Sequence, residues 1–156
     1  MKNRIICFIC SRGGHLTDLE PLIEELGSED SFLVTEKAVD TENLADYYIT
    51  PFHRMDNIRG IYPTKLLKNI IQSTKIILKE RPKYVISTGA IMCVPLIYLS
   101  KIFGSKIIYI ECSNRVTQPS YTGRVVYPVS DYFFLQWKSL LKRYGKKARY
   151  RGNLIS

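Results

Sequence analysis

The sequence predicts an α/β fold in which a Rossmann-like parallel sheet carries helices on both faces. Short apolar runs, such as Ile5–Cys10 and Ile107–Ile110, alternate along the chain with longer segments of helical periodicity. Alternation of this kind indicates right-handed βαβ units and therefore a parallel sheet. With 156 residues the chain is long enough for one domain with its own core and too short for two. We expect a single domain over residues 1–156.

The individual elements follow from the positions of these runs. The expected strands span residues 5–10, 31–35, 47–49, 84–87, 106–110 and 132–135, with a further short strand at 148–150. A first helix is expected to carry Leu16, Leu19 and Leu22 on one face. Longer helices are expected from Thr64 to Glu80, where Pro63 suits the first turn, and from Ile91 to Phe103. The segment Pro51–Pro63 is predicted to be a loop.

The composition is typical of a soluble globular protein, with 46% hydrophobic and 24% charged residues. The sequence contains no run of about 20 apolar residues, and the first apolar run is too short for a signal peptide. Cytosolic residence is therefore expected. Four cysteines lie in apolar surroundings, and no second ligand pair accompanies the Cys-x-x-Cys of Cys7 and Cys10. We predict buried thiols and neither a metal nor a cofactor.

The formal net charge of +9 indicates an anionic partner. The cations concentrate near the C-terminus, at Lys138, Lys142, Arg143, Lys146, Lys147, Arg149 and Arg151. Phosphate-bearing ligands and an anionic membrane surface both satisfy this charge, and a simple solvated helix face is the alternative. Because no nucleic-acid-binding motif accompanies the basic residues, we expect no nucleic-acid partner.

Three polar segments follow expected strands directly: Ser11–His15, Ser87–Ala90 and Glu111–Gly123. Ligands of parallel sheets bind at the carboxyl ends of the strands, so three such segments on one edge predict a site. In the first segment, strand, glycine pair and helix form the geometry that presents backbone N–H groups to an anion. A tight turn with a helix-capping histidine explains the same segment equally well.

Taken in order, these segments resemble one family, the acceptor-side, membrane-recruiting subunit of the two-subunit N-acetylglucosaminyltransferase of lipid-linked oligosaccharide synthesis, together with its bacterial relatives in capsule and exopolysaccharide assembly. The resemblance covers essentially the whole chain. It rests on residues 11–16, 87–90 with Pro95, 109–111 with Arg115, 120–124, Asp131, 136–137 and 150–154.

The same segments are similar to the N-terminal half of GT-B glycosyltransferases, the half associated with the lipid acceptor. The resemblance implies a single GT-B N-terminal-type domain that binds a polyprenyl-diphosphate-linked glycan. It also implies a heterodimer with a donor-binding subunit that shares the UDP-sugar, since one half cannot enclose the reaction. The chain is expected to be inactive alone and peripheral on the cytoplasmic face of the membrane. A self-sufficient nucleotide-sugar or phosphate-ester enzyme and a purely structural recruiter are the alternatives.

Sugar transfer needs a base for the acceptor hydroxyl and stabilisation of the leaving diphosphate. His15 is the predicted base or positioning group, with helix capping as the alternative. Glu111 is a second candidate, with an ion pair to Arg115 or Arg124 as the alternative. The predicted phosphate- or substrate-binding residues are Ser11, Gly13, Gly14, Thr88, Gly89, Arg115, Thr122, Gly123 and Arg124.

The C-terminal segment is the predicted interface with the partner subunit, through Tyr150, Gly152, Leu154 and Ile155. The alternative is that Leu154 and Ile155 close the core of this domain. Membrane contact is expected from the amphipathic helix that begins near Thr64 or from the segment 54–62, although ordinary packing of that helix on the sheet explains its pattern too. Trp137 is expected in the core, with a place at an interface as the alternative.

Overall fold

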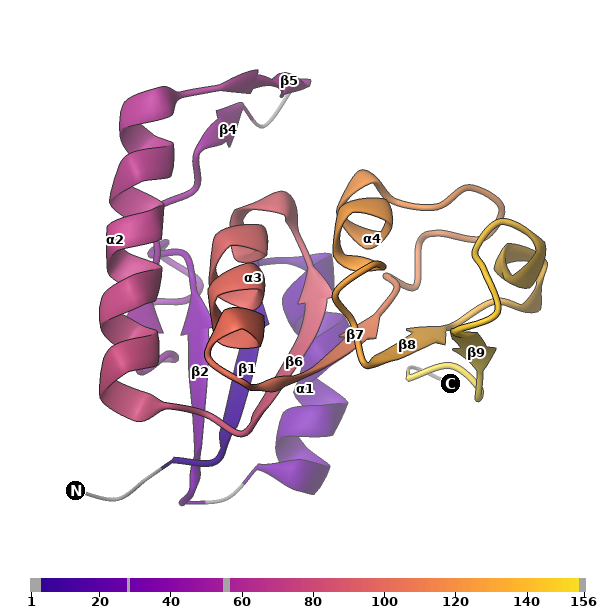
Figure 1. Ribbon diagram of the computed structural model, residues 1–156, viewed down its shortest axis with the longest axis horizontal. Coiled ribbons are helices and arrows are strands. Elements are labelled where there is room, and N and C mark those ends of the chain that lie inside the picture. Colours follow the sequence, from indigo (N-terminus) through magenta and orange to yellow (C-terminus); the bar gives the residue numbers. More distant parts are fainter. Residues whose placement is uncertain (1–3, 28, 55–56, 155–156) are drawn as a thin grey trace.

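The computed structural model describes residues 4–27, 29–54 and 57–154, with the backbone alone for residues 53–54 and 57–59. Its main sheet has seven parallel strands in the order β3-β2-β1-β6-β7-β8-β9 (Figure 1). The strands are β1 (Ile6–Cys10), β2 (Ser31–Thr35), β3 (Tyr47–Tyr48), β6 (Tyr84–Gly89), β7 (Lys106–Ile110), β8 (Tyr132–Leu135) and β9 (Ala148–Tyr150). The expected α/β fold with a parallel sheet is confirmed.

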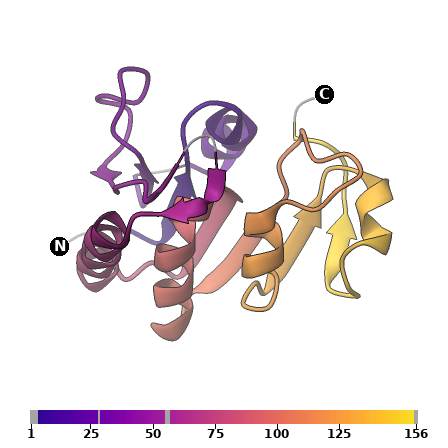
Figure 2. The ribbon, with the colours of Figure 1, turned by 90° about the horizontal axis from the view of Figure 1, so that it is seen from above.

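Helices cover both faces of this sheet, as Figures 1 and 2 show together. On one face lies α1 (Gly14–Leu26). The other face carries α2 (Pro63–Glu80), α3 (Val94–Ile102) and the short α4 (Tyr121–Val126). Single 3₁₀ turns, η1 (Ile91–Cys93) and η2 (Lys138–Lys142), precede α3 and β9.

The core is divided into two clusters by the alternation of side chains along the strands. In β1, Cys7 and Ile9 join the larger cluster beneath α2 and α3, whereas Phe8 and Cys10 join the smaller cluster beneath α1. All four residues are buried. A strand covered on both faces needs a continuous apolar run, which explains why Ile5–Cys10 shows no alternation of apolar and polar residues.

The expected loop over residues 51–63 is wrong in its middle part. There β4 (His53–Arg54) pairs antiparallel with β5 (Asn57–Ile61), and the chain enters α2 at Pro63. β4 has only two residues and β5 contains Gly60, so neither segment is long or regular enough for the sequence pattern to reveal the pairing. The expected helix from Ile91 also begins later, at Val94, after the 3₁₀ turn.

The four cysteines are free and buried, as expected. Burial raises the pKa of Cys10 to about 12 and that of Cys112 to about 11, so both thiols stay protonated at neutral pH. Within the described residues, no cluster of His, Cys, Asp or Glu side chains is arranged to hold a metal ion. None of the helices in this part of the chain has the length and apolar character needed to cross a membrane.

Candidate functional site

The turn between β1 and α1 is built around Gly13, the N-cap of the helix. Its φ of 71° lies in the region that side chains with a Cβ disfavour, and its carbonyl accepts the N–H groups of Leu16 and Thr17 at 2.8 and 3.0 Å. Amide groups in the first turn of a helix have no intrahelical acceptor. A Cβ on Gly14 would meet no atom within 4 Å, and the first turn contains no acidic residue. The backbone at Gly14 is therefore open to an approaching anion.

His15 is held by backbone and side chain of Thr88. The imidazole Nδ1 lies 2.8 Å from the Thr88 carbonyl oxygen, and the Thr88 hydroxyl donates to the His15 carbonyl oxygen at 2.6 Å. Because a carbonyl can only accept, Nδ1 carries the proton of this bond and Nε2 of the neutral ring is left with a free lone pair. Burial lowers the pKa of His15, partly offset by the Thr88 carbonyl. The ring is therefore neutral at pH 7.

Gly89 provides the space for this ring. Its φ is 112°, and a Cβ there would lie 2.8 Å from Cε1 of His15. The Gly89 N–H donates to the Ser87 hydroxyl at 3.1 Å, and its carbonyl accepts the Ser11 N–H at 3.0 Å. Thr88 and Gly89, predicted to bind phosphate, thus use these groups to seat His15 and to join β6 to the glycine turn. Ser11 is buried in the same junction.

Glu111 lies beneath the loop that follows β7. Its side chain is fully buried and accepts the N–H groups of Cys112 and Ser120, at 3.1 and 3.0 Å, and the hydroxyl of Tyr144. This arrangement differs from both expected roles of Glu111, a base and an ion-pair partner. The carboxylate is not presented to a ligand, and the described contacts include no ion pair to Arg115 or Arg124. Glu111 instead holds the loop in shape.

Three further side chains fix the same loop from outside. Asp18 of α1 accepts the Ser113 N–H at 2.8 Å, the Trp137 indole N–H donates to the Ser113 carbonyl at 2.6 Å, and the Ser139 hydroxyl donates to the Val116 carbonyl. Trp137 is 37% exposed, so its expected place in the core is wrong. The indole N–H needs a polar partner, and the loop supplies it. Asp18 was not predicted; an acidic residue between the buried Leu16 and Leu19 was the available signal.

The loop ends at α4, where the Ser120 hydroxyl caps the helix by accepting the Gly123 N–H at 2.8 Å. A Cβ on Gly123 would collide with the Tyr144 hydroxyl and the Glu111 carboxylate. Gly123 is therefore a close-packing residue whose N–H is bonded to the Ser120 hydroxyl, and its expected contact with phosphate stays a prediction. Arg124 is exposed on α4.

A small cleft of about 110 Å³ opens between the glycine turn and this loop. It brings together three predicted site residues, His15, Arg115 and Thr122. Asn114 and Tyr121 also line it and were not predicted, together with Ala90, Ile91 and Ser120. The cleft combines a neutral imidazole, an exposed guanidinium and hydroxyl groups, next to the open first turn of α1. Such a set can bind an anionic group and accept a proton from a hydroxyl.

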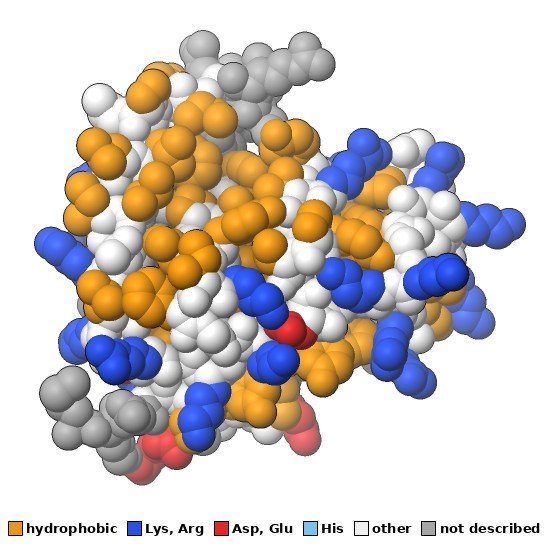
Figure 3. Space-filling model, viewed as in Figure 1, with side chains coloured by type: hydrophobic (Ala, Val, Ile, Leu, Met, Phe, Trp, Pro, Cys, Tyr) orange, Lys and Arg blue, Asp and Glu red, His pale blue; other side chains and the backbone are white. Residues whose placement is uncertain are grey.

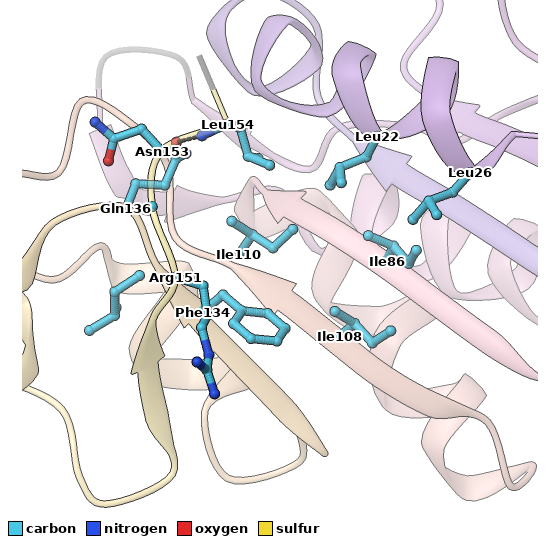
Figure 4. Close-up of a pocket in the computed structure, with 12 residues that line it drawn as sticks. Leu22, Leu26, Ile86, Ile108, Ile110, Phe134, Gln136, Arg151, Asn153 and Leu154 are labelled. Carbon is cyan, nitrogen blue, oxygen red and sulfur yellow. Dashed lines mark hydrogen bonds between the residues drawn. The ribbon is translucent and has the colours of Figure 1, made fainter. Parts of the chain in front are cut away.

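A second, apolar groove of about 330 Å³ lies on the α1 side of the sheet. Figure 4 shows Leu22 and Leu26 of α1 directed toward Ile86, Ile108 and Ile110 of the strands. The C-terminal segment forms its other border through Arg151, Gly152, Asn153 and Leu154.

Leu154 packs against the cluster beneath α1, and its N–H donates to the Gln136 side chain at 2.9 Å. Of the predicted interface residues, Gly152 and Leu154 line this groove, and Leu154 also contributes to the core. Tyr150 lies beside Lys138, whose Nζ is 5.4 Å from the centroid of the Tyr150 ring. Ile155 lies outside the described residues.

Comparison with known proteins identifies the family. The family described as "Oligosaccharide biosynthesis protein Alg14 like" matches residues 25–154. The chain belongs to this Alg14-like family. Among its relatives is the UDP-N-acetylglucosamine transferase subunit ALG14 of Candida albicans, 42% identical over 84 residues, with 50% of this chain and 38% of that protein covered. The human ALG14 subunit is 26% identical over an alignment of 96% of this chain and 82% of its own length.

Solved structures agree with the fold. MurG of Acinetobacter baumannii superposes with a TM-score of 0.74 at 12% identity, over 96% of this chain and 46% of that one. A UDP-GlcNAc 2-epimerase of Methanocaldococcus jannaschii gives a TM-score of 0.70 at 17% identity, over 95% and 45%. The chain thus spans about half the length of these two proteins. The expected GT-B N-terminal-type fold is confirmed by this likeness.

Proposed function

We propose that this chain is the acceptor-binding subunit of a two-subunit glycosyltransferase, which transfers N-acetylglucosamine from UDP-N-acetylglucosamine to a polyprenyl-diphosphate-linked acceptor. Membership of the Alg14-like family supports the subunit role, and the names of its relatives support the donor. The single observation that carries a catalytic part for this chain is the seating of His15. Its Nδ1 is fixed on the Thr88 carbonyl while Nε2 keeps a free lone pair beside a polar cleft.

The reaction follows from these groups. The acceptor hydroxyl attacks the anomeric carbon of the donor sugar as the bond from that carbon to the UDP oxygen breaks, and His15 Nε2 takes the hydroxyl proton. The open N–H groups near Gly14 and the Arg115 guanidinium bind the diphosphate of the lipid acceptor. Glu111 and Asp18 act as positioning residues that keep the loop carrying Arg115 in place.

The partner in this proposal is a donor-binding chain that completes the second half of a GT-B enzyme and docks at Tyr150, Gly152 and Leu154. The complex works at a membrane because its acceptor is lipid-linked, and its place on the cytoplasmic face stays the expectation that the sequence resemblance gives. A place in capsule or exopolysaccharide assembly rests on the sequence resemblance alone and stays a prediction. The lipid-linked oligosaccharide class is what the family description supports.

The test is transfer from UDP-N-acetylglucosamine to a polyprenyl-diphosphate glycan, assayed with this chain alone, with the donor-binding chain alone and with both. We expect product only from the mixture. Turnover by this chain alone would show a self-sufficient enzyme. If the mixture is active and stays fully active with His15→Ala, the chain is a recruiter without a catalytic residue.

A further inference from the structure

The outward surface of α2 is divided into two stripes by the helical period. At 100° per residue, Leu67, Ile70, Ile71, Thr74 and Leu78 fall on one side, and a separate row of lysines falls beside them. The four apolar residues are 38–59% exposed, although the helix also has a buried side that faces the core. A helix that only packs on a sheet needs one apolar stripe. α2 has a second.

This exposed apolar stripe continues onto neighbouring elements. Ile61 and Tyr62, which lead from β5 into α2, are 51% and 41% exposed. α3 packs against α2 and exposes Ile102 and Phe103 at its end, by 76% and 54%. Figure 3 shows the result as apolar side chains gathered over α2 and α3, with Lys and Arg around their edges. Patches of this kind on soluble proteins mark interaction sites.

The exposed charges of α2 have one sign. The lysine row of α2 consists of Lys65, Lys68, Lys75 and Lys79, all exposed. The helix has a single acidic residue, Glu80, which is buried and bonded to Arg4. Asp131, which directly precedes β8, is bonded to Lys101 and Lys106. Within the part of the chain that the structure describes, none of the four lysines of α2 forms an ion pair, so the surface presents apolar groups beside unpaired ammonium groups.

We propose that α2, with the exposed ends of β5 and α3, is the surface by which this protein lies on an anionic lipid bilayer. Lysine is depleted at protein–protein interfaces, whereas interfacial helices combine an apolar stripe with a lysine-rich flank. The aliphatic part of each lysine covers apolar surface while the ammonium group reaches the lipid phosphates. The four lysines of α2 are thus matched to anionic headgroups and poorly matched to a protein partner.

The orientation of α2 connects this surface with the cleft. α2 begins at the edge where the carboxyl ends of the sheet strands lie, the same edge that carries the glycine turn (Figure 1). Leu67 and Tyr62 are therefore at the end of α2 nearest the site, and an acceptor diphosphate at the bilayer surface reaches the cleft along this edge. This step rests on the proposed function, whereas the docking surface itself rests on the exposure and charge of α2.

The test is flotation of the purified full chain with vesicles of phosphatidylcholine and phosphatidylglycerol, compared with vesicles of phosphatidylcholine alone. The triple variant Leu67→Ser, Ile71→Ser, Leu78→Ser should lower the partition coefficient about 100-fold. The triple variant Lys68→Gln, Lys75→Gln, Lys79→Gln should lower it about tenfold or more on anionic vesicles only. Val39→Ser is the matched control, since Val39 is 95% exposed in the β2–β3 connection on the α1 side of the sheet (Figure 2).

Unchanged vesicle binding by the leucine and isoleucine variant, with a native melting temperature, overturns the proposal, as does a wild-type chain that does not bind anionic vesicles. If instead the wild type self-associates in sedimentation and this variant is monomeric, the surface is a protein interface and the proposal is wrong. Vesicle binding is measured without sugar transfer. Its failure therefore leaves the proposed transferase function intact, and a failed transferase assay leaves this surface intact.

Discussion

The glycine turn before α1 and the loop after β7 form opposite walls of one cleft, yet they are held in different ways. The turn is fixed largely through its backbone groups: the Gly13 carbonyl bonds to residues three and four positions on, and the Ser11 N–H and the His15 carbonyl bond to Gly89 and Thr88 of β6. The loop is fixed by side chains from distant parts of the chain, at sequence separations of 95 residues for Asp18, 33 for Tyr144 and 24 for Trp137.

This difference assigns ligand binding to the turn and structural stability to the contacts beneath the loop. In the turn, groups near the cleft stay unoccupied, which leaves them for a ligand. Beneath the loop, the buried Glu111 carboxylate already accepts hydrogen bonds from protein donors, so it stabilises the loop. Substitutions in the turn should therefore affect ligand binding and turnover, whereas substitutions beneath the loop should affect folding first.

The largest effect is expected beneath the loop. Glu111→Leu leaves the Cys112 and Ser120 N–H groups and the Tyr144 hydroxyl buried without an acceptor, and should lower the free energy of unfolding by about 3–5 kcal/mol. Glu111→Gln keeps one carbonyl acceptor and should cost less. Urea denaturation followed by circular dichroism measures both. If Glu111→Leu lowers the free energy of unfolding by less than about 1 kcal/mol, the loop does not depend on this buried carboxylate, and the proposed difference between loop and turn is wrong.

The second effect concerns His15 in the assembled complex. His15→Gln offers an N–H donor to the Thr88 carbonyl but has no basic nitrogen, so turnover should fall about 100-fold, or about 2.7 kcal/mol of barrier, with little change in stability. His15→Ala should match it in rate and be less stable. Steady-state transfer assays with melting curves compare the two. Equal activity of the glutamine variant and wild type would assign His15 to structure.

A third comparison lies within the turn. Gly13→Ala should cost about 1–2 kcal/mol of stability because φ is 71°, whereas Gly14→Ala should leave stability unchanged or higher. The Cβ of the Gly14→Ala variant lies where a phosphate would approach, so acceptor affinity should fall about tenfold. Equilibrium binding of a polyprenyl-diphosphate acceptor provides the measurement. Unchanged affinity in this variant means that the anion binds elsewhere.

The smallest effect is a pH dependence. Burial places the pKa of His15 in the folded protein below its ordinary value of 6.5, so the unfolded chain binds this proton more readily. The contribution to stability is fully present above pH 6.5 and is lost as the pH falls toward the folded pKa. Denaturation from pH 7 to pH 5 should show a smaller fall in the unfolding free energy for His15→Gln than for wild type. Parallel curves for the two proteins would contradict this.

The sequence by itself determined the elements whose signals are local. Apolar runs located the strands of the main sheet, the glycine pair with the following leucines located the turn and α1, and the position of His15 after that turn made it a candidate base. These features depend on residues within about one helical turn of each other, so the hydrophobic pattern of the sequence reveals them.

Tertiary structure decided what depends on distant partners. Glu111, Thr88, Gly89 and Gly123 were predicted to face a ligand because polar residues and glycines at strand ends often do, but long-range packing turned them inward to seat His15 and the loop. Asp18 and the exposed Trp137 gained their roles only through Ser113, which lies 95 and 24 residues away in sequence. A buried polar group must find its partner wherever the fold places one, and that position is not recorded in local sequence.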